Sequence, residues 1–266
     1  MTALPPPRSG VGSAARGLTA LSAGAGNVIV ALGAAPRKLS HRFRQRFPLV
    51  AVTGMSGVGK TRLVDRLSRH SGAPGGEETG SAVMERRTRR TARGHGFRFR
   101  VVPGDNAATR LGALDDVFHD EPVDGVLHVV AYGHATPRKA VGVDEPASTG
   151  REAQLAAELE DWTITGHLIA AMAVRSDRPV WLVIVVTKTD LFPDQVEQAV
   201  RYYSPGSGTP FGNKLDELRA LAGGARLSID VVPMSVPTES EPATSSAAKD
   251  QLAGLERRMA QLSGHV

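Results

Sequence analysis

The chain has 266 residues, of which 41% are hydrophobic and 22% charged, as expected for a globular protein with a full hydrophobic core. The absence of cysteine excludes disulfides, thiolate metal sites and cysteine nucleophiles, and it fits a reducing compartment such as the cytoplasm. The formal net charge of +5 permits contact with acidic partners but does not require it.

The N-terminal region, residues 1–46, differs in composition from the rest of the chain. Residues 17–36 carry no charge, and the basic segment RKLSHRFRQR follows at once. The length of the uncharged run would suit a membrane span, but Gly, Ala, Ser and Thr dilute its hydrophobicity. We expect an Ala/Gly-rich extension that forms a docked or mobile helix. The alternative is peripheral membrane contact through 17–46, which the basic flank would favour on anionic lipid.

From residue 47 to residue 266, apolar strand patterns alternate with amphipathic helix patterns. Strands are predicted at 47–52, at 123–133, at 180–190, at 227–235, and as two strands within 84–102. Helices are predicted at 61–70, 151–176, 193–203, 213–223 and 249–262. Helices that separate buried apolar strands indicate an α/β fold, with a mostly parallel central sheet between two helical layers. We therefore expect one three-layer P-loop NTPase domain over 47–266.

The stretch GMSGVGKT, residues 54–61, lies between a predicted strand and a predicted helix and matches the pattern G-x-x-x-x-G-K-[ST]. Its glycines let backbone N–H groups turn toward phosphate oxygens, and the helix that follows adds the positive end of its dipole. Lys60 is expected to reach the β- and γ-phosphates, and the Thr61 hydroxyl to ligate Mg²⁺. The predicted phosphate-binding residues are Gly54, Ser56, Gly57, Val58, Gly59, Lys60 and Thr61.

The tetrapeptide TKTD, residues 187–190, ends the most apolar predicted strand. It resembles the [NT]-K-x-D motif of P-loop GTPases of the Ras-like and translation-factor class, and the resemblance covers about residues 47–266. A carboxylate there can accept from the ring N–H and the exocyclic amine of guanine, whereas adenine offers no such donor pair. The resemblance implies that Asp190 reads guanine and that the Lys188 stem packs along the ring. Thr187 stands where Asn is more common.

A second guanine contact is expected after the last strand, where the family usually has Ser-Ala. Ser235 and Val236 stand there, and a serine that merely ends the strand explains Ser235 equally well. By the resemblance the expected ligands are GTP or GDP with Mg²⁺.

The Asp-x-x-Gly motif of the family is incomplete in this chain. Gly104 fits its glycine, whose N–H contacts the γ-phosphate, but Val101 occupies the position of the aspartate that supports Mg²⁺. Asp105 follows, where many relatives carry the residue that orients the attacking water, although capping the next helix is an equal alternative. The expected catalytic residues are Lys60, Gly104 and Asp105.

Two switch regions are expected beside the γ-phosphate. Thr79 lies in a Gly-rich segment at a spacing similar to that of the small Ras-like proteins, and it is expected to sense Mg²⁺ and the γ-phosphate. Residues 105–120 would form the second switch, and an effector or regulatory protein is expected to contact both. The basic stretch ERRTRRTARGHGFRFR is interpreted as a charged edge hairpin, so no specific nucleic acid is predicted.

The expected function is a cytoplasmic guanine-nucleotide switch protein that binds GTP with Mg²⁺ and hydrolyses it slowly. A non-hydrolysing GTP sensor or scaffold is one alternative, and Val101 motivates it. An ATP-binding P-loop protein and a membrane-associated assembly module that uses 17–46 are the others. The abundance of Ala, Gly and Arg indicates a bacterial gene rich in G and C.

Overall fold

The structure is a computed structural model that describes residues 47–68, 85–90, 96–104, 107–119, 123–136, 150–236 and 246–264. The N-terminal extension, Thr79 and Asp105 lie outside these ranges, so the expectations for them stay predictions. Within the described ranges, no helix combines the length and the apolar character that crossing a membrane requires.

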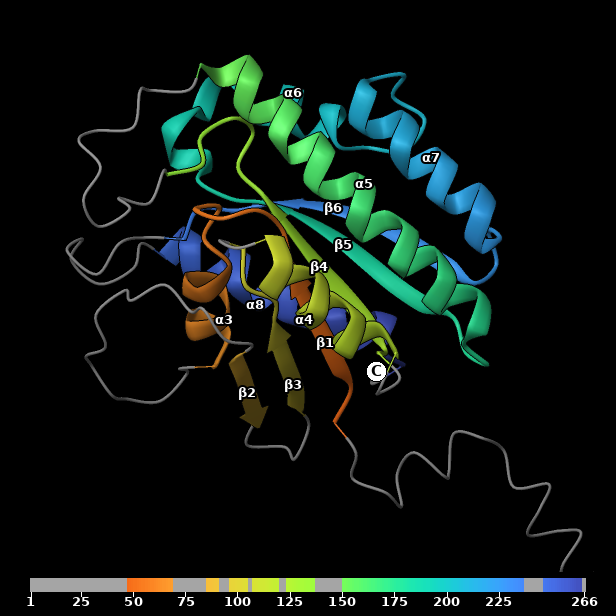
Figure 1. Ribbon diagram of the computed structural model, residues 1–266. Helices are drawn as coiled ribbons and strands as arrows, with labels where there is room; N and C mark the ends of the chain where they lie inside the picture. Colours follow the sequence, from red (N-terminus) through yellow and green to blue (C-terminus); the bar gives the residue numbers. More distant parts are fainter. Residues whose placement is uncertain are drawn as a thin grey trace, which may run out of the picture. The chain divides into compact units, whose positions relative to one another are not determined.

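The described strands form one six-stranded sheet in the order β2-β3-β1-β4-β5-β6 (Figure 1). β2 pairs antiparallel with β3, and all other neighbouring strands in this sheet are parallel. The mostly parallel sheet predicted from the sequence is confirmed. The strands are β1 (Leu49–Thr53), β2 (Glu85–Arg90), β3 (Gly96–Val101), β4 (Gly125–Val130), β5 (Val180–Val186) and β6 (Leu227–Pro233).

The described helices are α3 (Lys60–Ser68), α4 (Ala107–His119), α5 (Arg151–Arg175), α6 (Val196–Tyr202), α7 (Pro210–Ala222) and α8 (Ser246–Leu262). Two short 3₁₀ turns, η1 (Thr189–Leu191) and η2 (Pro193–Gln195), precede α6. The predicted helix at 193–203 is thus a 3₁₀ turn followed by a shorter α-helix, and such tight turns are common at helix N-termini. Helix α7 begins at Pro210 rather than at 213, because the Thr209 side chain accepts the Gly212 N–H at 3.1 Å.

Alternate residues of each central strand enter two hydrophobic clusters, one on each face of the sheet. In β1, Leu49 and Ala51 pack in the cluster with α4, α5 and α7, whereas Val50 and Val52 pack with α3 and α8. Every residue of β1, β4 and β5 is buried, because helices cover both faces. This explains why these strands are continuous apolar runs in the sequence, and it confirms the three layers.

The five parallel strands, β1 and β3 to β6, bring the segments that follow them to one edge of the sheet, and Gly104 lies in the segment after β3. The segments that follow β1, β4, β5 and β6 all begin at the carboxyl ends of these strands, at the upper left of Figure 1. Open α/β sheets bind ligands at this edge. The segments 54–59, 131–136, 187–190 and 234–236 are therefore the place to look for a site.

Candidate nucleotide site

The phosphate loop joins β1 to α3 and depends on glycine at two close contacts. Gly54 has φ +126° and Gly57 has φ +75°, values that side chains with a Cβ rarely adopt. A Cβ on Gly54 would lie 2.2 Å from the Val129 carbonyl oxygen, and one on Gly57 would lie 2.0 Å from the Thr136 carbonyl oxygen. These two glycines therefore let the loop fold tightly against the end of β4 and the segment after it.

Lys60, the first residue of α3, points back into the loop. Its ammonium Nζ donates to the Gly54 and Met55 carbonyl oxygens, each at 2.8 Å, and the residue is only 8% exposed. The loop thus wraps around a buried positive charge at a helix N-terminus. Such an arrangement favours an anionic ligand such as phosphate.

The backbone of Gly104 lies directly against this loop. A Cβ at Gly104 would be 2.6 Å from the Ser56 amide nitrogen and 2.7 Å from Lys60 Nζ. Val101, at the position where the family has aspartate, is only 3% exposed and belongs to the hydrophobic cluster of α3 and α8. The glycine of the motif therefore contacts the phosphate loop, while the valine packs in the core.

The TKTD segment is bonded to the phosphate loop and to the segment after β4. The Thr187 hydroxyl lies 2.7 Å from the Val58 carbonyl oxygen, and the Lys188 ammonium donates to Thr136 Oγ1 at 2.5 Å and to the His134 carbonyl oxygen at 2.8 Å. Lys188 adopts a left-handed conformation with φ +57°. A threonine hydroxyl suffices for the contact with the loop, which explains why Asn is not required at position 187.

Asp190 and Ser235, two of the residues predicted to contact guanine, lie together. The Ser235 hydroxyl is 2.8 Å from Asp190 Oδ1, and the Ser235 N–H donates to the Gln251 side chain of α8 at 3.0 Å. Val236 is partly buried against the cluster of α3 and α8. A serine that merely ended β6 would not have to meet Asp190, so this contact favours the site interpretation of Ser235.

Helix α5 contributes polar residues that sequence reasoning missed. The Glu158 carboxylate accepts the Ala131 N–H at 3.0 Å and is bonded to the Tyr203 hydroxyl, while Gln154 accepts the Ala135 N–H at 2.8 Å. These contacts hold the segment 131–136, which in turn contacts Gly57 and Lys188. The signal for them was present as polar residues at helical spacing within a largely apolar helix: Arg151, Gln154, Glu158, Asp161 and Thr165.

Burial changes the protonation of the Glu158–Tyr203 pair. Burial raises the pKa of Glu158, although hydrogen bonds from Tyr203 and Ala131 oppose the shift. Burial and the neighbouring Glu158 raise the pKa of Tyr203 well above its usual range, so its hydroxyl stays a hydrogen-bond donor. The buried hydrogen bond of this pair therefore links α5 to Tyr203.

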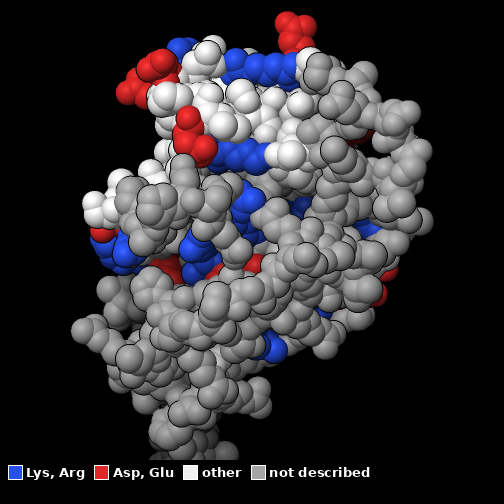
Figure 2. Space-filling model, turned by 90° about the vertical axis from the view of Figure 1, so that its left-hand side faces the viewer, with Lys and Arg blue, Asp and Glu red and all other residues white. Residues whose placement is uncertain are grey.

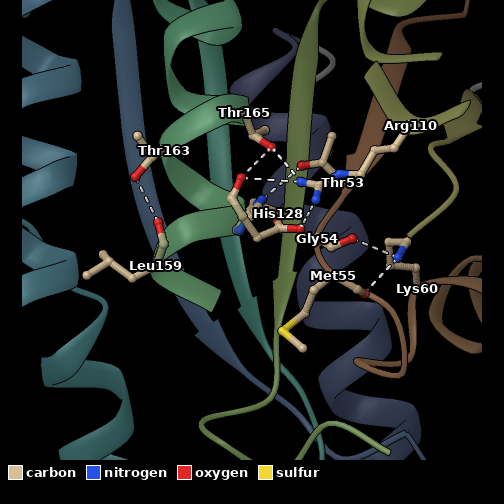
Figure 3. A network of polar contacts seen from close by, with 10 residues as sticks. Thr53, Gly54, Met55, Lys60, Arg110, His128, Leu159, Thr163 and Thr165 are labelled. Carbon is tan, nitrogen blue, oxygen red and sulfur yellow. Dashed lines mark hydrogen bonds and ion pairs between the residues drawn. The ribbon is translucent and has the colours of Figure 1, made fainter. Parts of the chain in front are cut away.

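A second polar network lies beneath the phosphate loop, where Thr53, Lys60, Arg110, His128 and Thr165 meet (Figure 3). The Thr53 hydroxyl is 3.0 Å from His128 Nδ1, and the Arg110 guanidinium forms an ion pair with the buried Asp161. Burial is the main cause that lowers the pKa of His128 to about 3, and the nearby charges of Arg110 and Lys60 contribute to this shift. This histidine is therefore neutral at physiological pH.

The residues present fit a magnesium ion held mainly by phosphate. Thr61 is the second residue of α3 and is half-buried beside Lys60. Among the described residues, no group of three His, Asp or Glu side chains could hold a metal ion by itself. Mg²⁺ keeps several waters and usually binds through phosphates with one or two protein groups, so a single hydroxyl is enough.

Charged side chains of both signs lie on the side of the molecule on which α3 lies in Figure 1. Figure 2 views this side and shows Lys and Arg side chains in several separate areas, with Asp and Glu side chains among them and toward the top. The buried Lys60 is therefore the charge that points to an anionic ligand at this site.

Known proteins match this chain by structure. No protein-family model matches it, and no curated protein matches it. The mammalian SRP receptor matches with a TM-score of 0.51 and 15% identity, over 80% of this chain and 99% of that one. A GTP-binding protein of Sulfolobus solfataricus, in complex with GDP, matches with a TM-score of 0.43 and 13% identity, over 86% of this chain and 55% of that one. A single-substitution variant of NFeoB of S. thermophilus, bound to GDP and aluminium fluoride, matches with a TM-score of 0.43 and 14% identity, over 82% of this chain and 64% of that one.

At such low identity the likeness concerns the fold. The sheet order, the single antiparallel strand, the phosphate loop after β1 and the match to the SRP receptor agree with one another. The described part of this chain has the three-layer α/β fold of a P-loop NTPase, and this fold is similar to that of the mammalian SRP receptor.

Proposed function

We propose that this protein binds GTP and GDP with Mg²⁺ and acts as a guanine-nucleotide switch. One observation carries the proposal: the phosphate loop and the TKTD segment are bonded to each other. The Thr187 hydroxyl reaches the Val58 carbonyl oxygen at 2.7 Å, and Lys188 reaches Thr136, which donates its N–H to the Gly57 carbonyl oxygen at 3.1 Å. A TKTD segment that only capped a loop would not need these contacts.

Asp190 would provide the selectivity for guanine. The Ser235 hydroxyl contacts one carboxylate oxygen and so orients the group, while the exposed carboxylate can still accept from the two donors of guanine. Adenine would leave this carboxylate without donors, which costs binding free energy. Lys188 would lie along the base, and Ser235 and Val236 would border it.

Lys60 would bind the β- and γ-phosphates, and the N–H groups of Gly54, Ser56, Gly57, Val58 and Gly59 would surround them. Mg²⁺, bound by Thr61 and phosphate oxygens, would neutralise charge on the β- and γ-phosphates. The Gly104 N–H would donate to the γ-phosphate. In hydrolysis, water would attack the γ-phosphorus in line, and Lys60 would stabilise the charge on the leaving diphosphate.

Slow hydrolysis follows from the missing carboxylate at Val101. Asp105 would orient the water or support the metal, and Thr79 would close over the phosphate. The segments around them would then bind an effector or regulatory protein in the GTP form. We retain as proposals the division of the chain into 1–46 and 47–266, and membrane contact through 17–46.

A second candidate function is a GTP sensor or scaffold without hydrolysis. It is favoured by the burial of Val101 in the core, since no carboxylate can replace it there without repacking. An ATP-binding protein is the less favoured alternative, because adenine lacks the pair of adjacent donors, a ring N–H and an exocyclic amine, that Asp190 would accept from in guanine.

The test is titration of the purified full chain with GTP, GDP and ATP in the presence of Mg²⁺, with phosphate release followed in the same samples. Selective GTP binding that Asp190→Ala abolishes, together with slow turnover, supports the switch. GTP binding without phosphate release supports the sensor. Preference for ATP that Asp190→Ala leaves unchanged would refute guanine recognition.

A further inference from the structure

Helix α4 is joined to helix α5 near its N-terminal end by the largely buried Arg110, while at its C-terminal end Arg175 of α5 donates to the Phe118 carbonyl oxygen at 3.4 Å. The Arg110 guanidinium of α4 forms an ion pair with Asp161, and it donates to the Thr165 hydroxyl and to the Asp161 carbonyl oxygen, each at 3.3 Å. The side chains of Arg110 and Asp161 are 13% and 4% exposed. Figure 3 shows Arg110 reaching from α4 toward Thr165 of α5. Both partners are therefore held in a single geometry.

The position of this attachment connects it to the phosphate loop. Helix α4 begins at Ala107, soon after Gly104, whose backbone packs against Ser56 and Lys60. Because only two residues separate Gly104 from α4 in the sequence, we expect a shift of α4 to change the position of Gly104 relative to the loop. Arg110 lies in the first turn of α4. Its ion pair with Asp161 therefore holds the end of α4 that is nearest to Gly104 in the sequence.

One guanidinium, that of Arg110, makes the contacts to both Asp161 and Thr165 of α5. A buried guanidinium loses its bonds to the carboxylate, the hydroxyl and the carbonyl together if the helix withdraws, because its fork of N–H groups is planar and rigid. Burial raises the pKa of Asp161, and the charges of Arg110 and Lys60 counter this effect. The carboxylate thus depends on the neighbouring cations for its charge.

We propose that Arg110 and Asp161 are positioning residues for the γ-phosphate: their ion pair holds α4 where the Gly104 N–H can donate to that phosphate. The pair thereby sets the relative affinity for GTP and GDP, since only GTP carries the group that Gly104 contacts. This inference rests on the proposed guanine-nucleotide function. A pair that served only to stabilise the fold would alter binding of both nucleotides alike, or of neither.

The test compares dissociation constants for GDP and for a non-hydrolysable imido analogue of GTP in the full chain with Mg²⁺. For Arg110→Met we expect the analogue to bind about tenfold more weakly, with GDP affinity nearly unchanged. Arg110→Lys keeps the charge but loses the planar fork. Its affinity for the analogue should lie between that of the wild type and that of Arg110→Met. The matched control is Arg258→Met, which breaks an ion pair of 2.6 Å to Asp230 between α8 and β6. Helix α8 packs on the opposite face of the sheet from α4, so this variant should leave the ratio unchanged.

A second variant separates positioning from folding. Arg110→Met/Asp161→Leu removes both charges and leaves none buried alone, so it should fold even if the single variant does not. We expect it to show the same selective loss of analogue affinity. If the folded double variant keeps the wild-type ratio of the two constants, the inference is wrong. If the wild-type chain binds neither nucleotide, the proposed function itself fails, which is a different outcome.

Discussion

The base end and the γ-phosphate end of the candidate site are built in different ways. At the base end, loop residues contact one another directly, as Thr187 contacts Val58 and Ser235 contacts Asp190. At the γ-phosphate end, Val101 replaces a carboxylate, and α4 is held by the remote pair of Arg110 and Asp161. In the proposed function, the residues that would bind the base and those that would act in hydrolysis therefore lie in separate parts of the fold. The first set can be kept while the second diverges.

The largest expected effect is the loss of nucleotide binding in Lys60→Ala. Removing the buried ammonium should weaken binding of GTP and GDP by about 3 kcal/mol, roughly a hundredfold, because charge-assisted bonds to phosphate are lost. Calorimetric titration measures this, and the exposed Lys214→Ala is the matched control. Unchanged affinity for both nucleotides would mean that the loop does not hold phosphate.

Next in size is the effect of restoring the missing acid. Val101→Asp should lower the free energy of unfolding by about 3 kcal/mol, because it buries a carboxylate in the cluster of α3 and α8. Urea denaturation followed by circular dichroism measures the change. We expect no faster phosphate release from the folded fraction. A stable variant with accelerated hydrolysis would instead show that Val101 alone accounts for slow hydrolysis.

A smaller and more selective effect is expected at the base end. Asp190→Ala should weaken GTP binding by about 2 kcal/mol, because two donors of guanine lose their acceptor, and it should leave ATP binding unchanged. The control is Asp194→Ala in η2, since Asp194 is also exposed and lies nearby in the chain. Equal weakening by both variants would point to a general charge effect in place of base recognition.

The smallest expected effect is a pH dependence that originates beneath the phosphate loop. The folded chain keeps His128 neutral down to a pKa of about 3, whereas the unfolded chain protonates it near 6.5. The unfolded state therefore binds more protons below pH 6.5, and stability falls as the pH falls. From pH 6.5 to pH 5 the loss should be about 1 to 2 kcal/mol.

Urea denaturation across this pH range measures the contribution of His128. Glu158 and Asp161 have raised pKa values and shift the balance the other way, so the wild type must be compared with His128→Asn. This variant should have a smaller loss of stability on acidification, whereas His167→Asn, at an exposed position on α5, should behave like the wild type. Identical curves for wild type and His128→Asn would show that His128 contributes nothing.

Local patterns in the sequence determined the order of strands and helices, the mostly parallel sheet and the phosphate loop. A buried strand is a continuous apolar run, and a phosphate loop needs glycines and a lysine at fixed spacing, so both can be read within a few residues. The valine at position 101, where the Asp-x-x-Gly motif has aspartate, can likewise be read from a few residues. Thr79, Asp105 and the N-terminal extension lie outside the described residues, and their roles stay predictions.

Only the tertiary structure decided which distant residues meet. The contact between Asp190 and Ser235 joins two strand ends, and the pair of Arg110 and Asp161 joins two helices. The sequence shows polar residues at helical spacing in α5 but gives no partner for them, because a side chain's partner depends on how neighbouring elements pack. Periodicity identifies the buried face of a helix, and packing alone determines what that face touches.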